Sequence, residues 1–174
     1  MSDRLIRRIS LFLHRFLSLL CICLIPYLAD YILSLYKGDK RWKMQTLCGI
    51  IIQALTGKRF SPVRPSWLKN PLTGRCMEID YYCDEFSLGI EYNGKQHYEY
   101  TPHFHKEAYC AYDGKVVPGT RHFELQVFRD EVKKSLCDQH GITLLIVPYT
   151  VKKEELVSYI LNKILIIQKH RRRV

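Results

Sequence analysis

The chain has 174 residues, enough for one domain with a hydrophobic core and an appendage. Its 27 Lys and Arg residues against 17 Asp and Glu give a formal net charge of +10, which predicts a polyanionic partner, nucleic acid or an anionic membrane surface, beyond a simple gain in solubility. Seven scattered cysteines without a CxxC pair argue against a disulfide scaffold or a zinc knuckle, so we expect an intracellular, reducing compartment.

The N-terminal part differs in character from the rest of the chain. Residues 16–36 form an apolar stretch in which Asp30 is the only formal charge, and a helix of this length reaches across a hydrocarbon core. Asp30 and Pro26 argue against a simple span, so a packed or dimer-forming helix and a targeting signal remain alternatives to membrane attachment. We therefore divide the chain into an apolar helical segment with its linker at 1–40 and a domain at 41–174.

The domain begins with an expected helix and a basic loop. Apolar residues at i, i+4 and i+8 predict an amphipathic helix over 44–56 that ends at Gly57. A basic loop with three prolines follows. Residues 41–75 carry seven basic side chains and no Asp or Glu, which again favours a polyanionic partner.

A predicted hairpin gathers carboxylates on one face. Residues 76–82 and 87–93 read as two strands joined by the turn CDEF. Alternation places Glu78, Asp80 and Tyr82 on one face of the first strand, opposite Met77, Ile79 and Tyr81. In the second strand it separates Glu91 and Asn93 from Leu88, Ile90 and Tyr92.

The second half of the chain completes an α/β pattern. An irregular stretch at 97–120, rich in aromatic residues and histidines, is long for a connection and indicates function or mobility. A helix is expected over 121–138, with Gly141 in the position of a C-cap, then a buried strand over 141–149 and a helix in the tail at 151–174. The order helix, strand, strand, helix, strand, helix predicts an α/β sandwich around a central mixed sheet.

Asp80 and Glu91 on adjacent strands are candidate metal ligands. Mg²⁺ and Mn²⁺ prefer oxygen ligands, often one or two carboxylates completed by water and a substrate phosphate. A cation held in this way activates water and offsets the charge that develops on a phosphodiester. Together with the basic loop, the pair predicts hydrolysis of nucleic acid.

Three stretches of the sequence carry a family resemblance: RPSWLKNPLTGRCMEIDYY, GIEYNGKQHYEY and FRDEVKKSLCDQHGITLLIVPY. They resemble the PD-(D/E)xK, or restriction-endonuclease-like, nuclease superfamily, near the very-short-patch repair endonucleases and similar proteins of large DNA viruses and phages. The resemblance covers residues from about 44 to 150. It implies a restriction-endonuclease-like α/β sandwich, a virus-encoded protein, and Mg²⁺-dependent hydrolysis of DNA in repair, recombination or mobile-element cleavage.

The resemblance also implies roles for individual residues. Asp80 and Glu91 match the two metal-binding acids, and Asn93 stands where the superfamily has a lysine. Relatives that replace this lysine carry a Gly and a His just beyond, matched here by Gly94 and His97, with Gln96 beside the histidine.

Two further matches lie on the helices. Arg129 and Asp130 resemble an Arg-Asp pair of the repair endonucleases, whereas Gln45 is the nearest polar residue to the Glu that their first helix commonly donates.

The side chains suggest catalytic roles of their own. His97 is expected to act as a general base or as the acid that protonates the phosphate, because imidazoles exchange protons near neutrality. Lys95 would contact the scissile phosphate in place of the missing lysine, unless it is an ordinary turn lysine. Asp130 would orient His97 or complete the metal site, unless it is a surface charge paired to Lys133 or Lys134. A zinc site built from His97, His103, His105 and Cys110 is a further alternative.

Basic and aromatic residues are candidate contacts to nucleic acid. Cations on the basic loop, on the expected helix over 121–138 and in the C-terminal HRRR sequence would bind backbone phosphates; on the loop and helix they are Arg64, Lys69, Arg75, Arg129 and Lys133. Trp67, Tyr98 and Tyr100 would stack on an unpaired base, unless they belong to the core.

Other classes of function stay open beside the endonuclease. Gln45 and Asn93 favour a catalytically weakened nuclease fold kept as a nucleic-acid-binding or membrane-tethered structural protein. A small membrane protein that binds anionic lipid is also possible on charge alone, but it leaves the hairpin acids unexplained. The sequence does not decide between a monomer and a homodimer.

Overall fold

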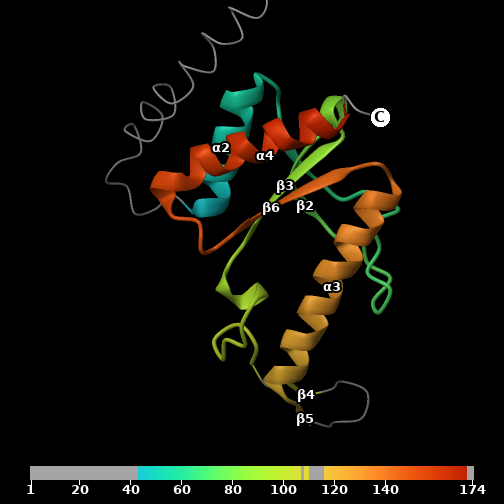
Figure 1. The fold of residues 1–174 in the computed structure, drawn as a ribbon. Coiled ribbons are helices and arrows are strands. Elements are labelled where there is room, and N and C mark those ends of the chain that lie inside the picture. The colour runs from blue at the N-terminus through green and yellow to red at the C-terminus, as the bar shows by residue number, and fades with distance from the viewer. Residues whose placement is uncertain (1–42, 107, 110–115, 172–174) are drawn as a thin grey trace, which may run out of the picture. The chain divides into compact units, whose positions relative to one another are not determined.

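The computed structural model describes residues 43–106, 108–109 and 116–171 (Figure 1). The chain separates into two compact units, residues 1–42 and Lys43–Val174, and all described residues belong to the second. The apolar segment expected at 16–36 lies outside the described residues. Within the described part, no helix is both long enough and apolar enough to cross a membrane.

A four-stranded mixed sheet forms the centre of the described unit, in the order β1-β2-β3-β6. Its strands are β1 (Ser61–Val63), β2 (Ile79–Cys83), β3 (Leu88–Asn93) and β6 (Thr143–Pro148). The helices are α2 (Met44–Thr56), α3 (Gly119–Gln139) and α4 (Leu156–Arg171). The first three strands pair antiparallel, and β6 pairs parallel to β3. The predicted mixed sheet and the order of its elements are confirmed, and this sheet has one extra strand, β1, inside the segment that was expected to be a loop.

Helices cover both faces of the sheet (Figure 1). Helix α2 packs against α4 and β3, and its apolar side buries Leu47 and Ile51 almost completely. A Cβ on Gly49 would lie 2.3 Å from ring atoms of Tyr81, so glycine lets the helix approach the sheet closely here. The helix ends at Gly57 with φ +65°, as the sequence predicts.

The opposite face of the sheet packs under α3. Its buried cluster consists of Leu68, Met77, Ile79, Cys137 and Ile142. Tyr82 and Leu144 pack against this cluster from the sheet, and Val132 and Leu136 do so from α3. Gly141, with φ +69°, follows α3 and turns the chain into β6.

Strand β2 contains a bulge, which corrects the simple alternation expected for residues 76–82. Ser61 of β1 pairs with Tyr82 and Val63 pairs with Ile79, so two steps along β1 match three steps along β2. The extra residue lies in the stretch that contains Asp80. As a result Tyr82 lies with Ile79 in the cluster under α3, although regular alternation would place them on opposite faces.

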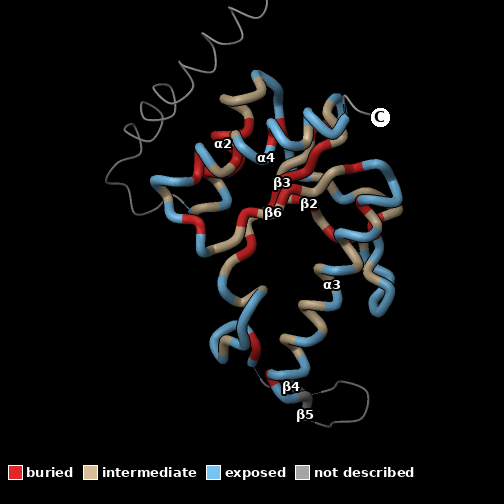
Figure 2. Tube along the Cα trace, viewed as in Figure 1, coloured by how far each residue is buried: buried red, intermediate tan, exposed pale blue. Residues whose placement is uncertain are grey.

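The stretch expected to be irregular contains a small second sheet. Strands β4 (Ala108–Tyr109) and β5 (Val116–Val117) pair antiparallel just before α3. Buried residues concentrate in the central sheet and in the sides of α2 and α4 that face it, whereas the first half of α3 lies away from this core (Figure 2). His105, only 2% exposed, joins the preceding loop to that half of the helix through a contact with Gln126.

Candidate active site

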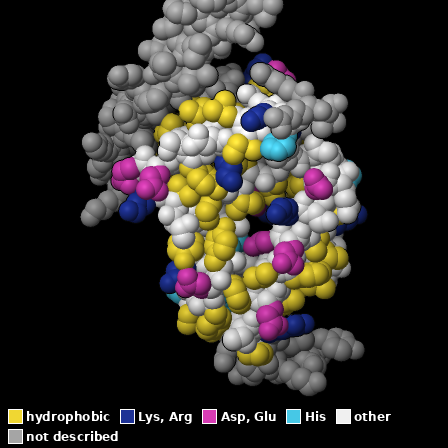
Figure 3. All heavy atoms as spheres, viewed as in Figure 1, with side chains coloured by type: hydrophobic (Ala, Val, Ile, Leu, Met, Phe, Trp, Pro, Cys, Tyr) yellow, Lys and Arg dark blue, Asp and Glu magenta, His cyan; other side chains and the backbone are white. Residues whose placement is uncertain are grey.

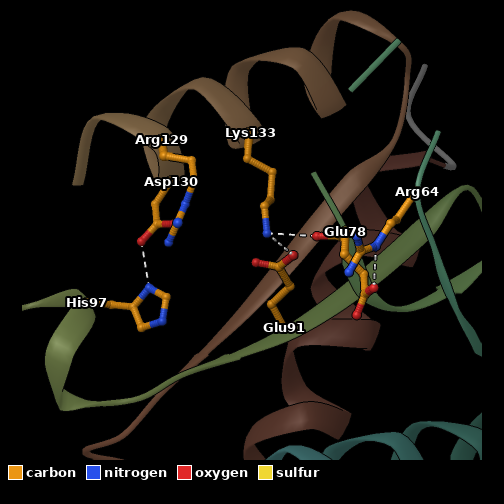
Figure 4. A network of polar contacts seen from close by, with 7 residues as sticks. All are labelled: Arg64, Glu78, Glu91, His97, Arg129, Asp130 and Lys133. Carbon is orange, nitrogen blue, oxygen red and sulfur yellow. Dashed lines mark hydrogen bonds and ion pairs between the residues drawn. The ribbon is translucent and has the colours of Figure 1, made fainter. Parts of the chain in front are cut away.

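Glu91 forms an ion pair across the face of the sheet that α3 covers. Its Oε1 accepts a hydrogen bond from Lys133 Nζ at 2.6 Å (Figure 4). The same ammonium donates to the backbone oxygen of Glu78 at 2.8 Å. Both side chains are nearly buried, with 8% of the Glu91 side chain and 13% of the Lys133 side chain exposed. The lysine therefore joins α3 to β3 and to the residue just before β2.

Asp80 lies within electrostatic reach of the same lysine. Burial raises the pKa of Asp80, while the charges of Lys133 and His97 and the backbone N–H of Tyr92 act in the opposite direction. Burial also raises the pKa of Glu91, against the effect of Lys133, and the negative charge of Asp80 raises it further. Two carboxylates and one ammonium thus form a coupled cluster, in which a second cation would stabilise the ionised acids.

His97 and Asp130 form a close pair beside this cluster. Nδ1 of His97 lies 2.6 Å from Oδ2 of Asp130 (Figure 4). About a fifth of each side chain is exposed. His97 comes from the 3-10 turn Lys95–His97 after β3, and Asp130 comes from the middle of α3. Because the aspartate engages Nδ1, Nε2 is left to exchange protons with a substrate or water.

The turn before His97 is held by its own side chains. The Gln96 amide folds over Gly94, where a Cβ would lie only 2.4 Å from its Oε1. Asn93 is 8% exposed, and its side chain hydrogen-bonds to Tyr98. Asn93 and Gln96 therefore support the turn and do not line the pocket described below.

A pocket of about 300 Å³ brings most of these groups together. Acidic residues and His97 line it, Arg75, Arg129 and Lys133 add positive charge, and Asn70 and Thr73 of the preceding turn also contribute. The full lining is Asn70, Thr73, Arg75, Cys76, Met77, Glu78, Asp80, His97, Arg129, Asp130 and Lys133. Figure 3 shows acidic and basic side chains side by side near the middle of the described surface. This mixture suits a phosphodiester, whose charge needs cations and whose cleavage needs proton transfer.

The other predicted cations do not line the pocket, although Arg64 contacts one of its lining residues. Lys95 is more than half exposed and pairs with Glu99 at 3.1 Å. Arg64 pairs with Glu78 at 2.7 Å, with 67% of the Arg64 side chain and 40% of the Glu78 side chain exposed. Lys69 is exposed on the loop that leads to the pocket.

Residues near the two ends of the described unit have other contacts. Arg171 of the C-terminal basic sequence hydrogen-bonds to the backbone of Phe86 and Ser87, and residues 172–174 lie outside the described part. Gln45 is exposed on α2 and is absent from the pocket lining.

Several aromatic and histidine side chains are engaged elsewhere. Trp67 stacks on His140 with ring centroids 4.1 Å apart and packs against the cluster under α3, so it is a core residue. His105 accepts a hydrogen bond from the Thr101 N–H at Nδ1, and its Nε2 contacts Gln126. Cys110, the fourth member of the zinc alternative, is not described.

The candidate metal ligands fit a hard divalent cation by their chemistry. Among the described residues there is no group of three or more His, Cys, Asp and Glu side chains placed to hold a metal ion. Asp80 and Glu91 number only two, and Mg²⁺ is commonly bound by one or two carboxylates with water and substrate phosphate. Two partly desolvated acids with raised pKa values are a suitable donor set for such an ion.

The ion pair between Lys133 and Glu91 was not predicted from the sequence. Lys133 was expected to contact phosphates of the DNA backbone. A signal was present in FRDEVKK, because Lys133 follows Asp130 by three residues and Arg129 by four, so all three share one side of a helix. The helix and the hairpin are far apart in the sequence, so the sequence does not show which acid the lysine contacts.

Comparisons with known proteins find viral relatives. The uncharacterized protein 307L of Invertebrate iridescent virus 6 is 40% identical over 110 residues, which cover 60% of this chain and 49% of the relative. Protein 033L of Invertebrate iridescent virus 3 is 37% identical over 101 residues, covering 58% and 46%. Protein 094L of Frog virus 3 is 39% identical over 113 residues, covering 65% and 66%.

These relatives support the expectation of a virus-encoded protein. The chain spans about half the length of the two invertebrate-virus proteins that it matches. No family model and no solved structure matches it. The relatives carry no stated activity, so the function rests on the site.

Proposed function

We propose that this chain is a metal-dependent endonuclease that hydrolyses phosphodiester bonds of DNA. One observation carries the proposal: the carboxylates of Asp80 and Glu91 are coupled to the ammonium of Lys133, next to the His97–Asp130 pair. A surface charge pattern alone would not require a buried Glu91, a nearly buried lysine paired to it and an oriented imidazole close together.

The groups divide the work of hydrolysis between them. Asp130 fixes the orientation of His97 through Nδ1, so Nε2 takes a proton from the attacking water or passes one to the phosphate. Lys133 offsets negative charge on the phosphate oxygens. Arg75 and Arg129, at the edge of the same pocket, hold the DNA backbone in position.

Asp80 and Glu91 are the residues that would hold Mg²⁺ or Mn²⁺. Such an ion supplies an activated water and neutralises charge at the phosphate. The site lies on one chain, so cleavage of both DNA strands in register calls for two copies. A homodimer and membrane association through 16–36 remain predictions of the sequence.

A second candidate is a nucleic-acid-binding protein with weakened catalysis. The ion pair between Glu91 and Lys133 favours it, because at 2.6 Å the lysine already neutralises one of the two candidate metal ligands. Asn93, at the position of the superfamily lysine, faces Tyr98 and not the pocket, which favours the same candidate.

Cleavage and binding assays with a labelled duplex oligonucleotide separate the two candidates. The full-length chain is incubated with the duplex in Mg²⁺, in Mn²⁺ and in chelator, and binding is measured on the same samples. Cleavage that needs the metal supports the endonuclease. Binding that weakens with salt, without cleavage in either metal, supports the binding protein.

A further inference from the structure

We propose that the loop after His97 is a stacking platform for unpaired bases, so that the substrate presents a single-stranded segment next to the bond that is cut. This inference rests on the proposed function and names the form of nucleic acid that the same site takes. Tyr98, Tyr100 and Phe104 carry it, with 46%, 44% and 61% of each residue exposed. All three rings come from one stretch of seven residues, 98–104.

Each of the three rings is supported on one side by another ring. Tyr100 stacks on His105 with centroids 5.7 Å apart and planes inclined by 23°. Tyr98 lies against Tyr149 at 5.7 Å. Phe104 meets the edge of a neighbouring histidine at 5.0 Å. The rings are therefore oriented before any ligand arrives, which lowers the entropy cost of stacking.

The backbone beneath the rings is fixed. His105, 2% exposed, accepts a hydrogen bond from the Thr101 N–H at 2.9 Å, and its other nitrogen lies 3.2 Å from Gln126 on α3. A Cβ on Gly119 would lie 1.9 Å from the backbone oxygen of His105, so the loop packs directly on the first residue of the helix. A buried anchor thus holds exposed rings, as expected of a binding surface.

The platform begins one residue after His97 of the candidate active site. Tyr98 follows His97 directly, and its hydroxyl is held by the Asn93 side chain at the end of β3. Aromatic faces stack on any base, and such stacking is independent of sequence. A paired duplex hides its base faces, whereas a single-stranded segment offers them to the rings while its phosphate reaches the pocket.

The test compares single-stranded and paired probes. Binding of a fluorescein-labelled oligothymidylate and of a labelled duplex hairpin is measured in chelator at one salt concentration, with the full-length chain. We expect the double variant Tyr100→Leu/Phe104→Leu to bind the oligothymidylate roughly tenfold more weakly and to change duplex binding less than about twofold. Leucine keeps apolar volume and removes the aromatic face.

Two further variants keep the result interpretable. Tyr100→Phe/Phe104→Trp retains the rings and is expected to bind like the wild type. Phe128→Ala, which removes a 41% exposed ring outside the loop, should leave both affinities unchanged. Because folding of the double variant is a concern, Phe104→Leu is measured alone. It changes only the most exposed of the three rings and should weaken binding of the oligothymidylate about threefold.

Equal losses on both probes, or no loss for either leucine variant, would overturn the platform. Cleavage of both probes in Mg²⁺ is recorded in parallel. If the wild-type chain cuts DNA and the leucine variants keep its preference between the two probes, the platform is overturned and the proposed endonuclease is not. A wild-type chain that cuts neither probe contradicts the proposed endonuclease.

Discussion

Lys133 of α3 and Glu91 of β3 lie 42 residues apart in the sequence, yet their charged groups meet at 2.6 Å in a nearly buried contact. The pair holds the helix that carries Asp130 against the strand that leads to His97. It also places an ammonium among carboxylates that burial makes harder to ionise. The stability of the fold and the proposed chemistry therefore both depend on this ion pair. Unfolding experiments measure the first, and cleavage assays measure the second.

Removing Lys133 is expected to destabilise the fold in a manner that depends on pH. Lys133→Met leaves Glu91 buried without its partner, at a cost of about 3 kcal/mol near neutral pH. Burial already raises the pKa of Glu91, and loss of the lysine raises it further. The cost is therefore greatest where the carboxylate is ionised and shrinks as the pH falls and the group is protonated. Urea unfolding at neutral and at mildly acidic pH measures both values.

The double variant Glu91→Gln/Lys133→Met is the control for this prediction. It removes both charges, so we expect most of the lost stability to return and the pH dependence to disappear. A single variant whose destabilisation is the same at both pH values would show that Glu91 is not the group left uncompensated.

The His97–Asp130 pair predicts a graded loss of cleavage. His97→Gln removes the proton-transferring group and should slow cleavage by roughly 100-fold or more at saturating DNA. Asp130→Asn keeps the imidazole but weakens its orientation, so a smaller loss is expected. Single-turnover rates separate these effects from binding, which should change little. Full activity of His97→Gln would remove the histidine from the proposed mechanism.

Cations at the pocket and outside it should behave differently on DNA. Arg129→Ala is expected to reduce the slope of log affinity against log salt by about one unit, because one phosphate contact is lost. Lys95→Ala is the matched control, since Lys95 pairs with Glu99 outside the pocket. Equal slopes for the two variants would show that pocket cations and outlying cations contact DNA alike.

As the pH is lowered, metal affinity should begin to fall at a higher pH than it does at a site of ordinary carboxylates. Asp80 and Glu91 have pKa values raised by burial, and a cation requires both groups ionised. Binding of Mn²⁺ should therefore weaken on mild acidification and release protons. Calorimetry in two buffers of different ionisation enthalpy measures this release, with Asp80→Asn as the control. Binding of the ion without a pH dependence would place it at other ligands.

Much of the fold could be predicted because local patterns determine it. The helical spacing that ends at Gly57 gave α2, and the apolar run bounded by Gly141 and Pro148 gave β6. Strand β1 was missed because its three residues include a proline and lie in a basic, polar stretch. The bulge near Asp80 was missed because it arises from pairing between β1 and β2, which a single strand does not encode.

The sequence predicted several residues of the candidate site, but it predicted fewer of the contacts between them. Asp80, His97 and Asp130 were selected from the sequence, and the structure places all three at one pocket. Lys95 was favoured over Lys133 because it lies next to the hairpin in sequence, whereas Lys133 reaches the acids only through packing of α3 on the sheet. Contacts of this kind depend on tertiary structure.

The central claim is tested most directly by cleavage of supercoiled plasmid by the full-length chain, measured in Mg²⁺, Mn²⁺ and chelator beside Asp80→Asn. The account predicts nicked or linear product only with a metal, and none from the variant. It also predicts that Asp80→Asn binds DNA at least as tightly as the wild type, because it removes a negative charge from the pocket. An intact plasmid under every condition, or equal cutting by the variant, would contradict it.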